Sequence, residues 1–255
     1  MSSTTIRRTP AGTNALTARN RMLASLPRLE RERLLSRLRP VRLPRGHMLW
    51  ERHQSVAQVY FLETGIVSAM VRQTAGDTTG ESNGVETCVL GSEGVVGVAA
   101  ILGGISPMMH VVQIPATGYM MAAEEFRQEW GRGGALQKAV MSHLRFFLSQ
   151  TAQTAFCNRL HPLESRLCRW LLVVAERAET DELPLTQEFL AAMLGARRAG
   201  VTLAAGELRE RGLIDYRRGR VFLRDHEGLE AASCECHRSI REEVKRLFAD
   251  YESLH

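Results

Sequence analysis

The stretch LTQEFLAAMLGARRAGVTLAAGELRERGLI, residues 185–214, contains two short helical patterns separated by Gly195. Apolar residues recur at helical spacing in each half: Leu190, Met193 and Leu194 in the first, and Val201, Ala204 and Leu208 in the second. Glycine tolerates the positive φ of a sharp helix-to-helix turn, and the small Ala191, four positions earlier, lets two crossing helices approach closely. The spacing of Ala191, Gly195 and Val201 therefore predicts a helix-turn-helix.

The segment that follows, LIDYRRGRVFL at 213–223, has two apolar runs joined by a basic turn, Arg217-Arg218-Gly219-Arg220. This pattern predicts two strands and a hairpin, and a helix-turn-helix followed by such a wing is a winged helix. Residues 186–224 contain eight arginines against four acidic residues, a net charge of +4 in a chain whose net charge is +5. Positive charge concentrated in one motif is typical of nucleic-acid-binding proteins.

The predicted DNA contacts come from the two helix starts and the wing. Arg197 and Arg198 open the second helix, where their side chains and the positive end of the helix dipole face phosphates or guanine edges. The wing arginines are expected to contact phosphates. The full predicted set is Thr186, Gln187, Arg197, Arg198, Thr202, Arg217, Arg218 and Arg220. Two alternatives remain: the arginines form an ordinary solvated face, or the winged helix binds another protein instead of DNA.

Composition places few limits on function. The chain has 255 residues, of which 44% are hydrophobic and 24% charged, as in an ordinary globular protein with two domains. Its five cysteines are scattered, so we expect reduced thiols and no disulfides. No stretch approaches the roughly 20 apolar residues of a membrane span, and the polar residues after Arg7-Arg8 lack the apolar core of an export signal. We therefore expect a cytoplasmic protein that does not enter a membrane.

The rest of the chain predicts three further regions. Residues 20–38 read as two short helices divided by Pro27. Between Val41 and Met121, short runs such as VYFL, IVSAMV, VETCVL and HVVQI predict many brief strands and hence a sandwich or barrel, with residues 77–84 as a long exposed hairpin loop. A long helix is expected from Ala135 to the breaker Pro162.

The long helix has an apolar stripe, which predicts packing against the same helix of a second subunit. The expected dimerisation residues are Leu136, Val140, Leu144, Phe147, Leu148 and Thr151. The alternative is a core helix of a single large domain. A final amphipathic helix at 239–254 is expected to pack back on the body, although RNA polymerase or another subunit are alternative partners.

Five motifs resemble the cyclic AMP receptor protein/Fnr family of bacterial transcription regulators. They are NRMLASLP (20–27), VYFLETGIVS (59–68), GSEGVVG (91–97), CNRLHPLESRLCRWLL (157–172) and LPLTQEFLAAMLGARRAGVT (183–202). The resemblance implies an α+β chain with an N-terminal β-roll (a cyclic-nucleotide-binding-like double-stranded β-helix), a long dimerisation helix and a C-terminal winged helix-turn-helix. It also implies a homodimer that binds a two-fold promoter site on double-stranded DNA and contacts RNA polymerase.

On this basis we expect five segments along the chain. These are a flexible tail (1–19), a β-roll sensor (20–132), a dimerisation helix and hinge (133–161), a DNA-binding domain (162–233) and a C-terminal helix (234–255). The hinge is predicted at His161-Pro162, where proline ends one helix and begins the next.

Two departures from the family pattern limit what the resemblance implies. Members that bind cyclic nucleotides hold the phosphate with an Arg-Ser/Thr pair, whereas this chain has SPMMH at 106–110, and Val98 in place of the ribose-binding glutamate. A buried phosphate without its arginine is an unpaired charge, so we expect no cyclic AMP binding, and the effector is unknown. The expected effector pocket comprises Gly91, Gly97, Met108, Met109 and His110. Along the recognition helix, where the family has Arg, Glu and Arg, this chain has Arg198, Ala199 and Leu203. Only the first of the three is kept, which predicts a different DNA consensus.

Metal and enzyme functions are not expected. Cys234-x-Cys236-His237 resembles part of a metal site, but zinc needs about four ligands and only His226 lies nearby in sequence. We therefore predict no metal and no cofactor, and interpret these cysteines as structural. The alternative enzyme is a cupin-like metalloenzyme on the barrel, which requires clustered histidines, and the chain contains no His-x-His.

Overall fold

The computed structural model describes residues 19–72 and 84–254. The chain divides into two compact units. The first comprises residues 1–67, 90–147 and 244–255, and the second comprises residues 68–89 and 148–243. The long helix and the C-terminal helix each contribute residues to both units, so the units are interleaved in sequence. The five segments expected from the sequence stay predictions.

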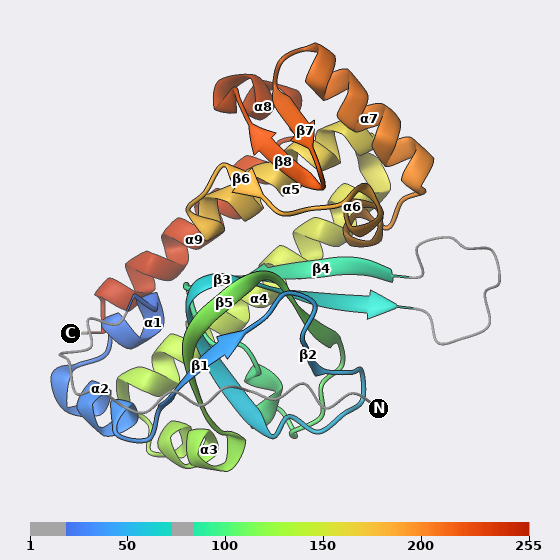
Figure 1. The fold of residues 1–255 in the computed structure, drawn as a ribbon. Helices are drawn as coiled ribbons and strands as arrows, with labels where there is room; N and C mark the ends of the chain where they lie inside the picture. Colours follow the sequence, from blue (N-terminus) through green and yellow to red (C-terminus); the bar gives the residue numbers. More distant parts are fainter. Residues whose placement is uncertain (1–18, 73–83, 255) are drawn as a thin grey trace. The chain divides into compact units, whose positions relative to one another are not determined.

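The N-terminal part of the chain is built on an antiparallel sheet with short helices around it (Figure 1). Its sheet has the order β1-β5-β3-β4, and β2 also pairs with β5. The strands are β1 (Arg39–Leu43), β2 (Met48–Trp50), β3 (Gln58–Arg72), β4 (Gly84–Leu90) and β5 (Met109–Ala122). The helices are α1 (Arg21–Ala24), α2 (Arg28–Leu35), the 3-10 helix η1 (Val98–Ile101) and α3 (Ala123–Gly131). The two helices predicted on either side of Pro27 are therefore confirmed.

The strands are fewer and longer than the sequence predicted. VYFL and IVSAMV lie in one 15-residue strand, β3, because Gly65, with φ of +81°, bends the strand without ending it. A Cβ at Gly65 would lie 2.4 Å from the Pro115 carbonyl oxygen, and one at Gly118 would lie 2.2 Å from the Phe61 carbonyl oxygen. Two glycines thus let β3 and β5 pack closely where they bend. The loop predicted at 77–84 lies outside the described residues, apart from Gly84.

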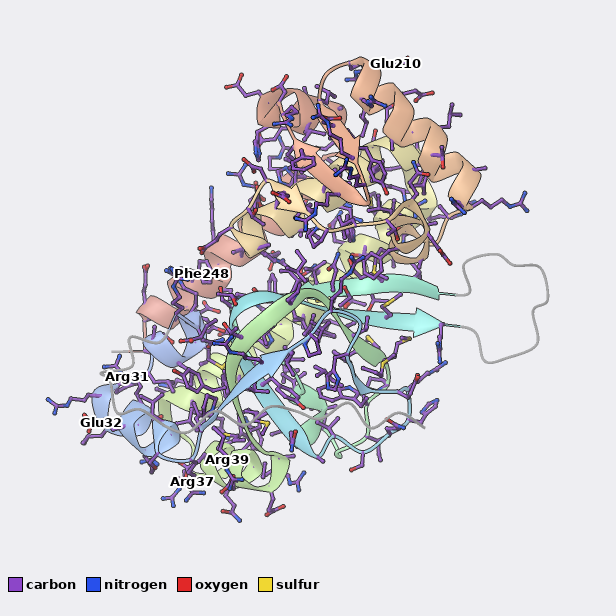
Figure 2. The ribbon with its side chains drawn as sticks, viewed as in Figure 1. Arg31, Glu32, Arg37, Arg39, Glu210 and Phe248 are labelled. Carbon is purple, nitrogen blue, oxygen red and sulfur yellow. The ribbon has the colours of Figure 1, made fainter. Side chains whose placement is uncertain are left out.

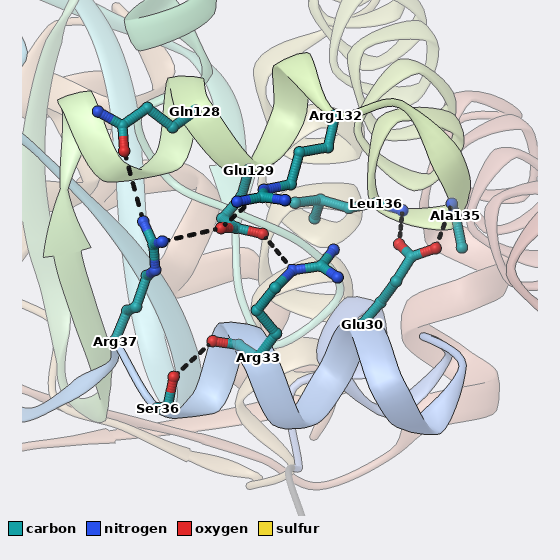
Figure 3. Close-up of polar contacts among 9 residues, drawn as sticks. All are labelled: Glu30, Arg33, Ser36, Arg37, Gln128, Glu129, Arg132, Ala135 and Leu136. Atoms are coloured by element: carbon teal, nitrogen blue, oxygen red, sulfur yellow. Dashed lines mark hydrogen bonds and ion pairs between the residues drawn. The ribbon is translucent and has the colours of Figure 1, made fainter.

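Polar contacts anchor the N-terminal helices to the start of α4 (Gly134–Leu160). The carboxylate of Glu30 accepts hydrogen bonds from the backbone N–H groups of Ala135 and Leu136, at 3.1 and 3.0 Å (Figure 3). These N–H groups lie in the first turn of α4, where no carbonyl within the helix can accept from them and where the dipole favours an anion. The predicted long helix is confirmed, and it is 27 residues long.

The second unit contains the elements that follow Pro162, up to residue 243 within the C-terminal helix. Pro162 lies between α4 and α5 (Leu163–Ala178), as predicted. The remaining elements are β6 (Glu182–Leu183), α6 (Gln187–Leu194), α7 (Arg198–Glu210), β7 (Ile214–Arg217), β8 (Arg220–Leu223), α8 (His226–Ala232) and α9 (Cys236–Glu252). The core beneath α6 and α7 buries Leu190, Leu194, Val201 and Leu208, all at 1% exposure or less. The small sheet has the order β6-β8-β7.

The C-terminal helix was predicted to be amphipathic, and its apolar side is buried. Ile240, Leu247 and Tyr251 are each exposed by 3% or less. The Tyr251 hydroxyl donates a hydrogen bond to the Glu93 carbonyl oxygen at 3.0 Å, within the first unit. The fold class is confirmed as α+β: an N-terminal antiparallel sheet domain, a long helix and a C-terminal helix-turn-helix with a small wing sheet.

Candidate nucleic-acid interface

The turn between α6 and α7 requires glycine for two reasons. Gly195 ends α6 with φ of +57° and ψ of +44°, a conformation that side chains with a Cβ adopt at a cost. A Cβ at Gly195 would also lie 3.1 Å from Val85, which leaves little room for one. At the other end of α6, the Thr186 hydroxyl accepts a hydrogen bond from the Phe189 N–H at 3.2 Å and caps the helix.

The predicted contact residues at the start of α7 are exposed. Arg197 is the N-cap and Arg198 the first helical residue, so both lie at the positive end of the helix dipole. One turn later, the exposed Thr202 hydroxyl lies 2.8 Å from Gln187 Oε1 and donates to it, which connects α7 with α6. The helix bears its acidic residues toward the other end, where Glu210 points away from the domain (Figure 2). An anion is therefore favoured only at the N-terminal end of α7.

The wing is a two-residue hairpin. Arg217 pairs with Arg220, and the two residues between them, Arg218 and Gly219, both have positive φ, +49° and +74°. Positive φ at both central positions is the geometry of a type I′ turn, which matches the twist of the flanking strands. The turn thus carries the Arg218 side chain at its tip, where it is exposed.

The wing tip lies beside the start of α6. A Cβ at Gly219 would be 3.6 Å from Thr186 Cγ2, and the Tyr216 hydroxyl donates to the Leu185 carbonyl oxygen at 3.2 Å. Thr186 and the wing arginines, separated by some thirty positions in sequence, are therefore neighbours in space. The structure brings the predicted α6 and wing residues together on one side of this unit.

Several arginines of this segment are engaged within the protein. Asp215 forms ion pairs with Arg217 at 2.7 Å, Arg224 at 3.7 Å and Arg209 at 3.9 Å. Two further pairs join Arg211 to Glu164 and Arg220 to Glu182. Among the described residues, Arg198 and Arg218 form no ion pair, so they are the arginines most available to an external anion. The net charge of the segment therefore overstates its free positive charge.

The predicted contact set omitted the one exposed large apolar residue of α7. Leu203 is 66% exposed, one residue after Thr202 and on the same solvent-facing part of the helix as Ala199. The exposure of this leucine could have been predicted from the helical period, because Leu203 lies outside the buried stripe of Val201, Ala204 and Leu208.

The residues of the predicted effector pocket are mostly buried. The Trp50 ring lies 4.9 Å from the His110 ring, and a Cβ at Gly97 would contact Trp50 at 3.3 Å. Burial lowers the pKa of His110 to about 4, opposed by a hydrogen bond to the Met108 backbone, so this imidazole is neutral at pH 7. Met109 is buried as well, and Gly91 lies in the turn after β4, where its N–H donates to the Glu93 carboxylate. The rings of Trp50 and His110 thus lie among the residues predicted for the effector pocket, and that pocket stays a prediction.

The predicted dimerisation residues have different environments along α4. Leu136 and Val140 are buried at 3% and 0% exposure, whereas Leu148 is 70% exposed. Leu144, Phe147 and Thr151 are partly exposed. Sequence reasoning missed three exposed apolar residues of the helix: Met141, Phe156 and Leu160. In the part of the chain that the structure describes, no helix is long and apolar enough to cross a membrane.

Comparison with known proteins agrees with this geometry. Residues 165–232 match the family described as the Crp-like helix-turn-helix domain. No curated protein matches the sequence. FixK2 from Bradyrhizobium japonicum has 14% identity and a TM-score of 0.64, covering 77% of this chain and 98% of its own.

Two other solved structures give similar values. The c-di-GMP-responsive global regulator CLP of Xanthomonas campestris has 17% identity and a TM-score of 0.62, covering 78% of this chain and 100% of its own. A Crp/Fnr-family transcriptional regulator from Thermus thermophilus has 19% identity and a TM-score of 0.56, covering 76% and 97%. At these low identities the structural similarity shows the fold alone, and the family match shows the helix-turn-helix domain. The chain therefore shares the fold of these Crp/Fnr-family structures and contains a Crp-like helix-turn-helix domain.

Proposed function

We propose that the chain is a sequence-specific transcription regulator that acts in the cytoplasm as a homodimer, with one α7 helix of each protomer in the major groove of DNA. The observation that carries this proposal is the exposed pair Arg197 and Arg198 at the N-terminal end of α7, in the same unit as the wing arginines. Arginine at that position reads guanine bidentately or binds phosphate. Two such helices related by a two-fold axis would contact half-sites about 34 Å apart.

The role that we propose for each contact residue follows from its local contacts. Arg198 is free of ion pairs within the described residues and is placed to contact a base. Arg218 at the wing tip, together with Thr186 at the start of α6, is placed to contact phosphates. Ala199 and Leu203 are exposed and apolar, and such side chains favour contact with thymine methyl groups over polar base edges.

The direct test is DNA binding across a salt series. The double variant Arg197→Ala with Arg198→Ala is expected to lose at least about 2 kcal/mol of binding free energy, roughly 30-fold in affinity, because base and phosphate contacts are both removed. Fluorescence anisotropy with promoter DNA would measure it. The matched control, Arg28→Ala with Arg31→Ala, removes the same charge from fully and partly exposed positions of α2 in the other unit.

The control is expected to leave affinity within about twofold of wild type, because neither arginine lies in the winged helix. Wild-type affinity should fall steeply as salt rises, because phosphate contacts release counterions. Unchanged DNA retention by the α7 double variant would instead support a winged helix that binds protein.

The homodimer part of the proposal is supported by the exposed side of α4. Met141, Leu148 and Ala155 recur every seven residues, with Leu144 and Thr151 between them. A seven-residue apolar repeat on a helix surface is the pattern of a two-helix seam, and Met141 and Leu148 are 53% and 70% exposed. Leu136 and Val140 are buried within the protomer, so the proposed seam begins at Met141.

The seam predicts a large effect of one substitution. Leu148→Glu places two carboxylates in the two-fold interface and is expected to weaken dimerisation by more than about tenfold, because burying an unpaired charge costs several kcal/mol. Sedimentation equilibrium would measure the association. Leu29→Glu in α2, at a residue that is 78% exposed, serves as the matched control and should leave the dimer intact. A monomeric wild-type chain would refute the seam.

Regulation through the β-roll belongs to the same proposal. A ligand that favours one of two spacings of the recognition helices would shift their populations, transmitted along α4. RNA polymerase is the proposed protein partner. The known structures that share the fold are described as transcriptional regulators, which favours this function over an enzyme built on the barrel.

A further inference from the structure

Four metal-ligating side chains meet at one place in the second unit. They are Cys157, His161, Cys234 and Cys236, whose sulfur and nitrogen atoms all lie within 4.8 Å of one another. Cys157 Sγ is 3.5 Å from Cys234 Sγ, and Cys236 Sγ is 3.5 Å from His161 Nδ1. The three cysteines are buried, with exposures of 0%, 7% and 0%. No part of the proposed DNA contact uses them.

The fold assembles this set from two distant segments. Cys157 lies in the last turn of α4, and His161 follows the helix at a spacing of four, which places both on one side of the helix end. Cys234 lies between α8 and α9, and Cys236 is the first residue of α9. The pattern is thus Cys-x3-His near the hinge and Cys-x-Cys more than 70 residues later.

The ligand types and spacing fit one tetrahedral ion. Zinc binds thiolate sulfur at about 2.3 Å and imidazole nitrogen at about 2.0–2.1 Å, so its tetrahedral ligand atoms lie about 3.5–3.8 Å apart. The two 3.5 Å separations observed here are close to that range. We propose that Cys157, His161, Cys234 and Cys236 form a structural zinc site that fastens the start of α9 to the hinge between α4 and α5.

Contacts around the four ligands support the assignment. His161 Nε2 lies 3.2 Å from the Glu235 carboxylate, so the other ring nitrogen is left to face the thiols. A carboxylate behind a metal-binding histidine is a recurrent arrangement that fixes the ring and its tautomer. Gln153 Nε2 donates a hydrogen bond to Cys236 Sγ at 3.0 Å, as backbone and side-chain N–H groups do toward thiolates at metal sites.

A buried guanidinium, that of Arg169, acts electrostatically on Cys157. Arg169 is only 4% exposed, and its Nε has no hydrogen-bond partner among the described residues. Three thiolates and one Zn²⁺ carry a net charge of −1, which the buried guanidinium compensates. Binding releases the thiol protons, so zinc affinity falls as pH is lowered.

Other interpretations fit the geometry less well. A disulfide between Cys157 and Cys234 would account for only two of the four clustered side chains and would give His161 and Cys236 no role. A polynuclear iron–sulfur cluster needs its ligand sulfurs farther apart than the 4.8 Å that contains all four atoms here. The neighbouring group of Glu176, Glu230 and His237 has exposed acids already paired with Arg241, so it does not form part of the site.

Zinc analysis of the full-length protein tests the site without reference to DNA. The chain purified under reducing conditions with zinc present is expected to retain about one zinc ion per protomer, measured by plasma emission spectrometry. Co²⁺ in place of zinc should give the absorption of a tetrahedral ion with thiolate-to-metal charge transfer. Cys157→Ser and Cys236→Ser should each lower zinc affinity at least about tenfold, and Glu235→Gln about 10–100-fold.

Matched variants separate ligation from folding. Cys88→Ala and Cys168→Ala change buried cysteines outside the cluster and should leave the zinc content unchanged. His161→Ala should weaken binding, whereas His161→Cys should restore it with a four-sulfur set and a Co²⁺ spectrum shifted accordingly. Wild-type protein without zinc, zinc that survives Cys157→Ser with Cys236→Ser, or a Cys157–Cys234 disulfide in the reduced preparation would each overturn the proposal. If the serine variants fail to fold, the Co²⁺ spectra of wild type and His161→Cys decide the question.

Discussion

Two groups of arginines in this chain are used in opposite ways. Around Glu129, the side chains of Arg33, Arg37 and Arg132 converge on one carboxylate that is 1% exposed, at distances of 2.6, 3.3 and 3.3 Å (Figure 3). At the start of α7 and at the wing tip, Arg198 and Arg218 form no ion pair among the described residues. The same residue type therefore stabilises the fold in one unit and is left available to an external anion in the other.

The difference shows why a count of charges is a poor guide to function. Burial raises the pKa of Glu129, but the bond and charge of Arg33, with the charges of Arg132 and Arg37, outweigh it and hold the pKa below its ordinary value. An arginine that forms an ion pair with such a carboxylate adds to the stability of the fold and presents little positive potential to an anionic ligand. An arginine without one contributes little to stability and much to binding, which the following predictions test.

The largest expected effect is at Glu129. Glu129→Gln leaves three guanidinium groups without their carboxylate and is expected to lower the free energy of unfolding by about 3 kcal/mol, measured by urea denaturation. Glu32→Gln, in an exposed ion pair with Arg28, is the control and should cost less than about 0.5 kcal/mol. Because the folded-state pKa of Glu129 lies below its unfolded value, its contribution is present at neutral pH and is lost as pH falls through the folded pKa. A Glu129→Gln variant with the wild-type free energy of unfolding would contradict the view that the arginines around Glu129 stabilise the fold.

A second buried carboxyl, Glu86, sharpens the comparison because no arginine of the described residues lies at ion-pair distance from it. Its oxygens contact Ser68 Oγ at 2.6 Å and the Trp170 indole N–H at 2.7 Å. Burial raises the pKa to about 7, and the bonds from Ser68 and Trp170 and the charges of Arg169 and Arg177 offset this only in part. Glu86 therefore titrates near neutral pH in the folded protein.

The sign of its effect on stability is opposite to that of Glu129. With a folded-state pKa above the unfolded one, Glu86 is protonated in the folded state at pH 5 and ionised in the unfolded state, so stability falls as pH rises through 7. The loss between pH 5 and pH 8 is expected to reach up to about 3 kcal/mol relative to Glu86→Gln, whose stability lacks this dependence. Denaturation at several pH values measures the difference. Parallel curves for the two proteins would show that Glu86 is ionised throughout.

The smallest expected effect is at the wing tip. Arg218→Gly removes one phosphate contact and should reduce the slope of log affinity against log salt by about 1, without changing which sequence is preferred. Its effect on stability should be near zero, because glycine relieves the positive φ of +49° while adding freedom to the unfolded chain. Arg211→Gly, at an arginine paired with Glu164, is the comparison and should leave the salt slope unchanged. An equal slope of log affinity against log salt for the two variants would contradict the proposed difference between paired and unpaired arginines.

Local patterns in the sequence predicted the elements well. The turn at Gly195, the break at Pro162 and the amphipathic final helix depend on residues within a few positions of each other, so their spacing is visible in the chain. The strand count was predicted less well, because Gly65 bends β3 where the sequence suggested an end. Whether a glycine bends or ends a strand depends on the neighbouring strand in the sheet, here β5.

The sequence by itself determined the helix-turn-helix, its wing and the arginines at the start of α7, because turn chemistry and helical period act over short distances. Tertiary structure decided that Arg211 and Arg220 are paired, since Glu164 and Glu182 reach these two arginines only through folding. It also brought Cys157 and His161 to Cys234 and Cys236, a set that looked incomplete from the two C-terminal cysteines. Contacts between segments more than 70 residues apart depend on how the helices pack, which no local pattern encodes.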